Sequence, residues 1–116
     1  MAVVVQRRYA DDGTRVQEWT EVDGRRQGTW RIWSLAGALL FETGFVDDLE
    51  HGTFTVWNEA GAMLQRGQVV RGVRHGEYTS WWDDGTLKEH GHYANGQRVA
   101  GYTYYRIDGS VWHRQE

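Results

Sequence analysis

The chain contains no cysteine and no proline, and only one of its thirteen basic residues is a lysine. Without cysteine it forms neither disulfides nor thiolate metal sites. No window approaches the run of about 18 apolar residues that a transmembrane helix needs. The twelve arginines are dispersed, so the basic patch that anionic lipids require is missing, and we do not expect contact with membranes.

The charge and composition exclude other classes of protein. A net charge of −3 argues against binding to nucleic acid, which needs a basic surface. Residues 1–8 place their charges after a very short apolar run, the reverse of a signal peptide, so we expect a cytoplasmic location. The chain is 40% hydrophobic and 14% aromatic, which argues for a packed structure, and its fifteen glycines then indicate many tight turns.

Turn residues recur along the sequence with a period of 24. The first series is Gly13, Gly37, Gly61, Gly85 and Gly109. A second series lies 11 residues after the first four members and comprises Gly24, Asp48, Gly72 and Gly96. A third series, which opens the forward segment of each unit, is Gly28, Gly52, Gly76 and Gly101. The sequence therefore predicts a tandem array in one domain, with approximate units 1–27, 28–51, 52–75, 76–100 and 101–116.

Large side chains keep the same period, in the columns Trp30, Phe54, Tyr78, Tyr102 and Tyr9, Trp33, Trp57, Trp81, Tyr105. The turn intervals leave room for strands of about 6–8 residues and are too short for helix pairs. We predict an all-β, elongated, single-layer antiparallel meander of stacked hairpins, roughly 45 Å long. The expected strands are 3–8, 14–22, 28–33, 38–46, 52–57, 62–70, 76–82, 86–94, 101–106 and 110–114.

The clearest unit runs from Gly76 to Gly96. It has glycine followed by aromatics at Tyr78 and Trp81, then a turn at Asp84-Gly85, an apolar strand and a second turn at Asn95-Gly96. This pattern resembles the MORN repeat superfamily, and most closely the bacterial MORN-variant family of YwqK-type antitoxins. The resemblance covers about residues 9–112, although Asp48 replaces an expected turn glycine and Gly101 stands one residue late. It implies a stacked-hairpin fold and leaves the partner open, because repeat scaffolds serve many partners.

Strand alternation assigns side chains to the two faces of the sheet. The even positions of the forward strands are nearly all apolar and form the core face if the turn at 34–37 has two or four residues, whereas a three-residue turn inverts the assignment. The odd face then carries large aromatics among charges, as protein interfaces do. The predicted interface consists of Trp33, Trp57, Trp81, Tyr105, Glu42, Arg66, Lys88, His90 and His92. The alternative is that these rings only cover the strands and one another.

We predict no catalytic residues, no metal site and no cofactor. His51 and His75 share a column and are expected two strands apart, about 9–10 Å, too far to bind one zinc ion, so a role in the repeat itself is favoured. His90 and His92 project on one side of a strand without a third ligand. The pairs Asp11-Asp12, Asp47-Asp48 and Asp83-Asp84 stand at turns, where aspartate caps backbone. No nucleophile motif or phosphate-binding loop is present, so we do not expect an enzyme.

Three functions are compatible with this pattern. The first is a bacterial immunity protein or antitoxin that binds and occludes a cognate toxin, which the resemblance implies. The second is a scaffold, adaptor or homo-oligomer that assembles through its terminal strands, since Val3-Val4-Val5 suits pairing with another chain. The third is a lipid-associated MORN protein, which the scarcity of lysine disfavours.

Overall fold

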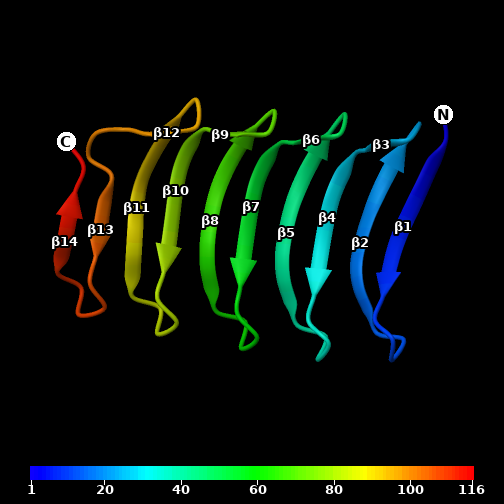
Figure 1. Cartoon of the computed structure of the whole chain (residues 1–116), viewed down its shortest axis with the longest axis horizontal. Helices are drawn as coiled ribbons and strands as arrows, with labels where there is room; N and C mark the ends of the chain where they lie inside the picture. Colours follow the sequence, from blue (N-terminus) through cyan, green and yellow to red (C-terminus); the bar gives the residue numbers. More distant parts are fainter.

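Ten long strands run antiparallel and side by side in chain order across the whole molecule (Figure 1). The computed structural model describes residues 1–116. The long strands are β1 (Val3–Tyr9), β2 (Arg15–Val22), β4 (Gly28–Trp33), β5 (Leu39–Val46), β7 (Gly52–Trp57), β8 (Met63–Val70), β10 (Gly76–Trp81), β11 (Leu87–Ala94), β13 (Thr103–Tyr105) and β14 (Val111–Arg114). The molecule is 48 Å long and 15 Å thick, which confirms the predicted single-layer all-β meander. No helix is long and apolar enough to cross a membrane.

The loops at the first glycine series have three residues, the alternative that was expected to invert the assignment of the two faces, and this expected inversion is wrong. In the second hairpin the Ser34 N–H donates to the Ala38 carbonyl oxygen at 2.8 Å, and Gly37 between them has a φ of 90°. A bulge at the end of β4 then adds one residue to the opposite strand. The bulge cancels the change of parity, so Ile32 and Phe41 still pair on one face, and the same bulge recurs in the other long hairpins.

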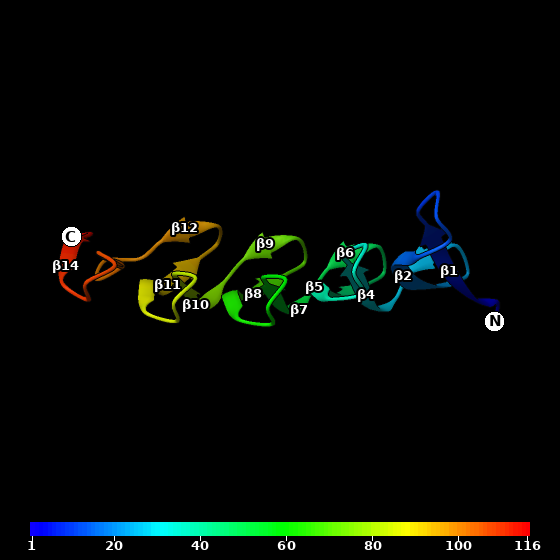
Figure 2. The ribbon, with the colours of Figure 1, turned by 90° about the horizontal axis from the view of Figure 1, so that it is seen from below.

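Four two-residue strands, which the sequence did not predict, redirect the chain between long hairpins. They are β3 (Arg25–Arg26), β6 (Leu49–Glu50), β9 (Val73–Arg74) and β12 (Gln97–Arg98). Each follows a turn with left-handed residues, such as Asp47 (φ 48°) and Asp48 (φ 72°), and pairs with the end of the long strand before it. In Figure 2, β6, β9 and β12 lie to one side of the long strands. The sheet is therefore a trough rather than a flat layer.

The inner face of this trough carries the even positions of the forward strands, and the outer face carries the odd positions. Only 12 residues are buried, as a single layer requires. The core is Phe54, Val69, Tyr78, Tyr93 and Tyr102, all on the inner face. Gly67 lies beneath two of these rings, since a Cβ there would stand 2.7 Å from Phe54 and 2.9 Å from Tyr78. The predicted core face is therefore the inner face.

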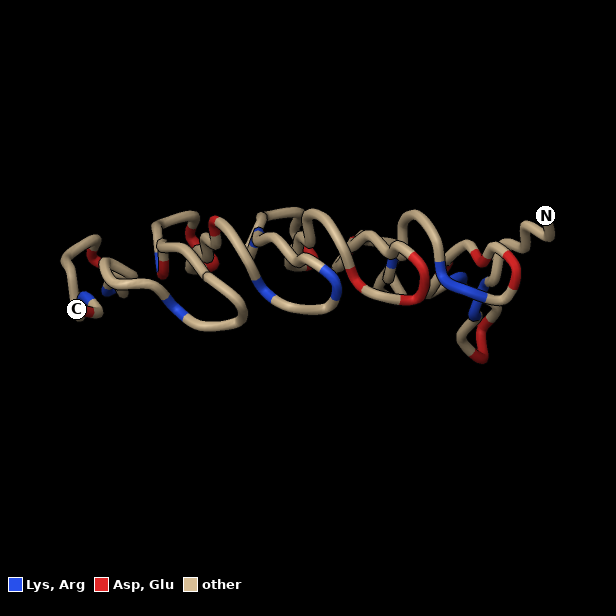
Figure 3. The backbone as a smooth tube through the Cα atoms, turned by 90° about the horizontal axis from the view of Figure 1, so that it is seen from above, with Lys and Arg blue, Asp and Glu red and all other residues tan.

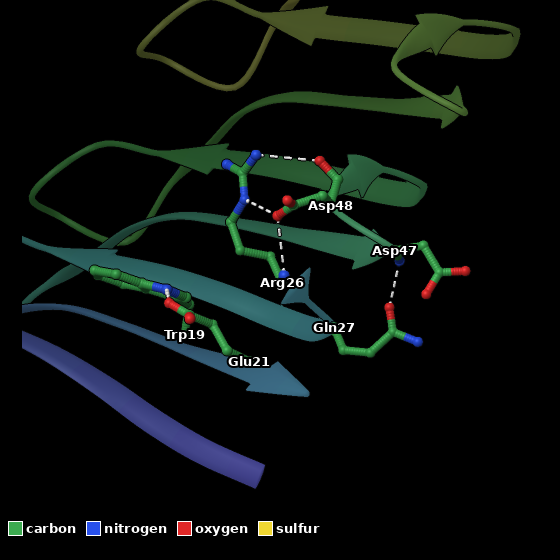
Figure 4. Close-up of polar contacts among 6 residues, drawn as sticks. All are labelled: Trp19, Glu21, Arg26, Gln27, Asp47 and Asp48. Carbon is green, nitrogen blue, oxygen red and sulfur yellow. Dashed lines mark hydrogen bonds and ion pairs between the residues drawn. The ribbon is translucent and has the colours of Figure 1, made fainter. Parts of the chain in front are cut away.

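Polar side chains join each unit to the turn of the next. The backbone N–H groups and their acceptors are Asp47 with Gln27 Oε1, Arg71 with His51 Nδ1 at 3.3 Å, and Asn95 with His75 Nδ1 at 3.2 Å. Both histidines thus have the role within the repeat that their common column favoured. Arg26 also donates from its backbone N–H (3.0 Å) and Nε (2.9 Å) to Asp48 Oδ1, as Figure 4 shows. The Asp at an expected glycine position is thereby held by the preceding unit.

Candidate protein-binding surfaces

The outer face carries one continuous row of polar side chains, because strand register aligns them across the whole sheet. The row runs Arg7, Glu18, Arg31, Glu42, Thr55, Arg66, Thr79, His90, Thr103 and Arg114. In the N-terminal half the charges neutralise one another. Arg7 Nε lies 3.0 Å from Glu18 Oε2, and Arg31 Nε lies 2.8 Å from Glu42 Oε2. Of the predicted interface, Glu42 is therefore already paired within the chain.

In the C-terminal half of the row the basic side chains alternate with threonines instead of carboxylates. Arg66 is exposed and makes no ion pair. It borders a shallow cavity of about 300 Å³ together with Gln68, Glu77, Thr79 and Trp81. Here the outer face has an unpaired cation, a large ring and a concave surface in one place.

The predicted aromatic anchors lie in the row next to these charges, opposite the bulges. Trp33, Trp57, Trp81 and Tyr105 are all half-buried, so part of each ring faces solvent. Trp33 is covered further, because the Arg15 guanidinium lies 4.8 Å from its ring centroid. The rings thus pack on the sheet and remain partly available to solvent.

The remaining predicted interface residues separate into two groups. His90 and His92 stay together on β11, with ring centroids 6.1 Å apart, and His90 Nε2 lies 3.6 Å from Glu77 Oε2. Lys88 lies apart at the bulge, with its ammonium 4.7 Å from the Trp82 ring centroid. The structure therefore gathers Arg66, Trp81, His90 and His92 near one another and leaves Trp33 and Glu42 outside that group, while Lys88 borders a second cavity that also includes Trp81.

Sequence reasoning missed the charged rim of the inner face. Arg74 and Arg98 come from the unpredicted short strands and lie over the aromatic core, with guanidinium-to-centroid distances of 5.2 Å to Tyr78 and 5.1 Å to Tyr102, respectively. The only signal available was the 24-residue spacing between them. A residue type that recurs with the period of the repeat and has no assigned role indicates residues of this kind.

The inner face also holds neutral tyrosine donors. Burial raises the pKa of Tyr78 and, further, that of Tyr102 above the ordinary value for tyrosine. The Tyr102 hydroxyl donates to Glu89 Oε1 at 3.1 Å, and Ser80 Oγ donates to Glu89 Oε2 at 3.1 Å. These groups are satisfied within the core, and no cluster of three or more His, Asp or Glu side chains is arranged to hold a metal ion.

The hairpin of β10 and β11 is the part of the chain that matches a known protein family. Residues 74–95 match the family model of the MORN repeat variant. The match begins at Arg74 in β9 and ends at the Asn95 turn, so it covers the unit with the clearest glycine and aromatic pattern. No curated protein matches the chain. The match supports the MORN-repeat resemblance, and a MORN-like array of stacked hairpins indicates a repeat module that binds proteins.

Proposed function

We propose that this chain is a non-catalytic module that binds a protein partner through the outer face of its C-terminal half. The carrying observation is the position of Arg66, exposed and without an ion pair, at a shallow cavity bordered by Trp81. A half-buried aromatic ring beside an unpaired arginine is the composition of an interface centre. The N-terminal part of the same row has its charges paired within the chain.

The partner that we propose is a toxin, with this chain as its cytoplasmic bacterial immunity protein or antitoxin. The support is the MORN repeat variant match over residues 74–95 and the resemblance to MORN-variant antitoxins. Inhibition would be steric. Trp57 and Trp81 anchor the toxin, while Arg66, His90 and His92 select it by charge and hydrogen bonding.

A co-purification experiment tests both levels of this proposal. The protein is expressed together with the product of the adjacent gene. The complex is isolated to measure binding, and growth of the cells shows whether this chain relieves the arrest that the neighbouring product causes. We expect Trp81→Ala and Arg66→Glu each to weaken binding at least tenfold, because each removes an interface-centre contact. Leu35→Ala is the matched control, because Leu35 is 66% exposed in a turn remote from the cavity.

Different results would contradict the placement of the interface and the antitoxin assignment. A complex that is unchanged by Trp81→Ala and Arg66→Glu would contradict the placement of the interface and keep the protein-binding function. A neighbouring product that binds tightly without being toxic would contradict the antitoxin assignment. Circular dichroism of each variant establishes that the fold persists.

Self-assembly is the second candidate, because β1 is an open edge. Its burial pattern is exposed at all positions but one, and Val3, Val4 and Val5 are 56%, 48% and 45% exposed. An exposed apolar edge strand pairs readily with another chain. Light scattering after size exclusion tests this: assembly predicts an oligomer that Val4→Pro dissociates, and a monomer at high concentration contradicts it.

A further inference from the structure

Three cavities follow one another along the trough on the inner face. Their volumes are about 370, 310 and 560 Å³ from the N-terminal side to the C-terminal side. The first and second share Glu50 and Phe41, and the second and third share Arg74. Because each cavity shares a wall with the next, they form one groove, divided by side chains of the short strands and bounded by Arg98 at the far end.

The dividing side chains form a column with a 24-residue period: Arg26, Glu50, Arg74 and Arg98. The first is neutralised, since Arg26 Nε lies 2.9 Å from Asp48 Oδ1. The other three have no ion pair. In Figure 3 the loop around β6 carries red segments, and each of the next two loops toward the C-terminus carries blue segments. The groove therefore presents one free negative charge followed by two free positive charges.

The two arginines without an ion pair lie over aromatic rings and have no carboxylate partner. The Arg74 guanidinium lies 5.3, 5.2 and 5.6 Å from the ring centroids of Phe54, Tyr78 and Tyr93. Arg98 lies 5.1 Å from Tyr102 and 5.7 Å from Tyr104. Arg74 Nη1 also donates to the Tyr93 hydroxyl at 3.5 Å, and its other N–H groups remain able to bind a carboxylate. Glu50 is likewise oriented, since Thr43 Oγ1 donates to its Oε2 at 2.7 Å.

The spacing of these charges matches an extended peptide. Successive short strands are two strand spacings apart, or about 9.6 Å. A chain in the extended polyproline II conformation has three residues per turn and advances about 3.1 Å per residue, so every third side chain lies on the same side, about 9.3 Å from the last. A peptide that runs along the trough thus presents every third side chain to Glu50, Arg74 and Arg98 in turn.

We infer that the groove binds an extended segment of a partner protein with one basic residue and, at three-residue intervals, two acidic residues. The basic residue faces Glu50, and the acidic residues face Arg74 and Arg98. Intervening apolar side chains rest on the aromatic floor. This site lies on the face opposite to the proposed toxin interface, so the two proposals stand independently.

Labelled peptides test the inference by fluorescence anisotropy at physiological salt. The first peptide has one lysine followed at three-residue intervals by two glutamates, with tyrosine and alanine between them. The second has the same composition with the two glutamates adjacent. We expect the first to bind at least tenfold more tightly, because only it brings both carboxylates to the arginines. Equal affinities, or binding of inorganic phosphate that displaces the peptide at millimolar concentration, would overturn the proposal.

Charge variants of the intact chain provide the second arm. Arg74→Gln and Arg98→Gln are each expected to weaken binding of the first peptide about tenfold or more. Arg71→Asn is the matched control, because it removes the same charge in the turn before β9, and Asn95 occupies the equivalent place one unit later. Glu50→Lys should reverse the preference at its position, so that a peptide with three glutamates binds best. If Arg71→Asn weakens binding as much as Arg74→Gln, net charge alone explains the affinity and the site is refuted.

Discussion

One side chain per unit holds the turn of the next unit in place. Gln27, His51 and His75 stand at equivalent positions, and each accepts a backbone N–H from a left-handed turn residue that would otherwise lack a partner. Glutamine and histidine share little except an acceptor at similar reach. The physical requirement at this column is therefore an acceptor, which the imidazole supplies through Nδ1.

Substitution of His75 tests whether this position requires a hydrogen-bond acceptor or the imidazole ring itself. His75→Ala leaves the Asn95 N–H without its acceptor and should lower the free energy of unfolding by roughly 0.5–1.5 kcal/mol. His75→Gln should recover most of that loss, because Gln27 makes the equivalent bond. Urea unfolding followed by tryptophan fluorescence measures both. Equal destabilisation by the two variants would show that the ring itself, not the acceptor, matters.

The turn aspartates make the stability of the fold sensitive to acid. Hydrogen bonds from Thr14, Thr86 and Ser110 lower the pKa of Asp12, Asp84 and Asp108 below the ordinary 3.8, and bonds from Arg26 lower that of Asp48. A lowered pKa means that the stabilisation is present above pH 3.8 and is lost as pH falls through the lower folded values.

We therefore expect stability to fall between about pH 4 and pH 2. Asp84→Asn keeps an acceptor that does not titrate, so the variant should lose less stability over this range than the parent chain does. Thermal unfolding at several pH values measures the difference. Identical losses in the two proteins would contradict a contribution from Asp84.

At the scale of elements, the glycines Gly67 in β8 and Gly91 in β11 let the aromatic rings of neighbouring units approach one another. Phe54 and Tyr78 have ring centroids 6.2 Å apart across Gly67. Tyr78 and Tyr102 are 6.4 Å apart across Gly91. A ladder of rings thus continues through the C-terminal units because the intervening strand presents no side chain there.

Gly67→Ala should accordingly destabilise the protein by about 1–3 kcal/mol through overpacking, since the new methyl group meets both rings. Arg66→Ala, one residue earlier and exposed on the outer face, should change stability by less than about 0.5 kcal/mol. Chemical denaturation compares the two. A Gly67→Ala protein as stable as the parent would mean that the rings move aside without cost.

At the scale of the whole molecule, the array behaves as a one-dimensional stack. Each long strand pairs only with its neighbours in the chain, and the residues of one period return to the same face. Such a stack tolerates loss of a whole repeat and not of a fraction, because a shift of one residue moves every side chain to the opposite face.

Two deletions test this register. Removal of residues 55–78 takes out one 24-residue period inside a strand, joins Phe54 to Thr79 and preserves alternation. We expect a folded protein about 9.6 Å shorter, measured by small-angle X-ray scattering. Removal of residues 55–77 places Tyr78 directly after Phe54 and should abolish cooperative unfolding. Equal behaviour of the two deletions would contradict a register-locked array.

The sequence by itself determined the period, the ten long strands and which face is apolar. These features are local, because left-handed turns select Gly, Asp and Asn, and alternation along each strand sorts side chains by polarity. The three-residue loop does not invert the faces, since the bulge that accompanies it restores parity. The MORN-like hairpin could be predicted from the sequence for the same reason, because its turn residues and strand alternation are local features.

Only the tertiary structure decided that the sheet is a trough and which charges are free. Arg26 and Arg74 occupy the same column, yet Arg26 is paired with Asp48 and Arg74 is not. Likewise Glu42 and Arg66 share an outer-face column, and Arg31 neutralises the former alone. Pairing depends on which side chains lie within a few ångströms across neighbouring strands and turns.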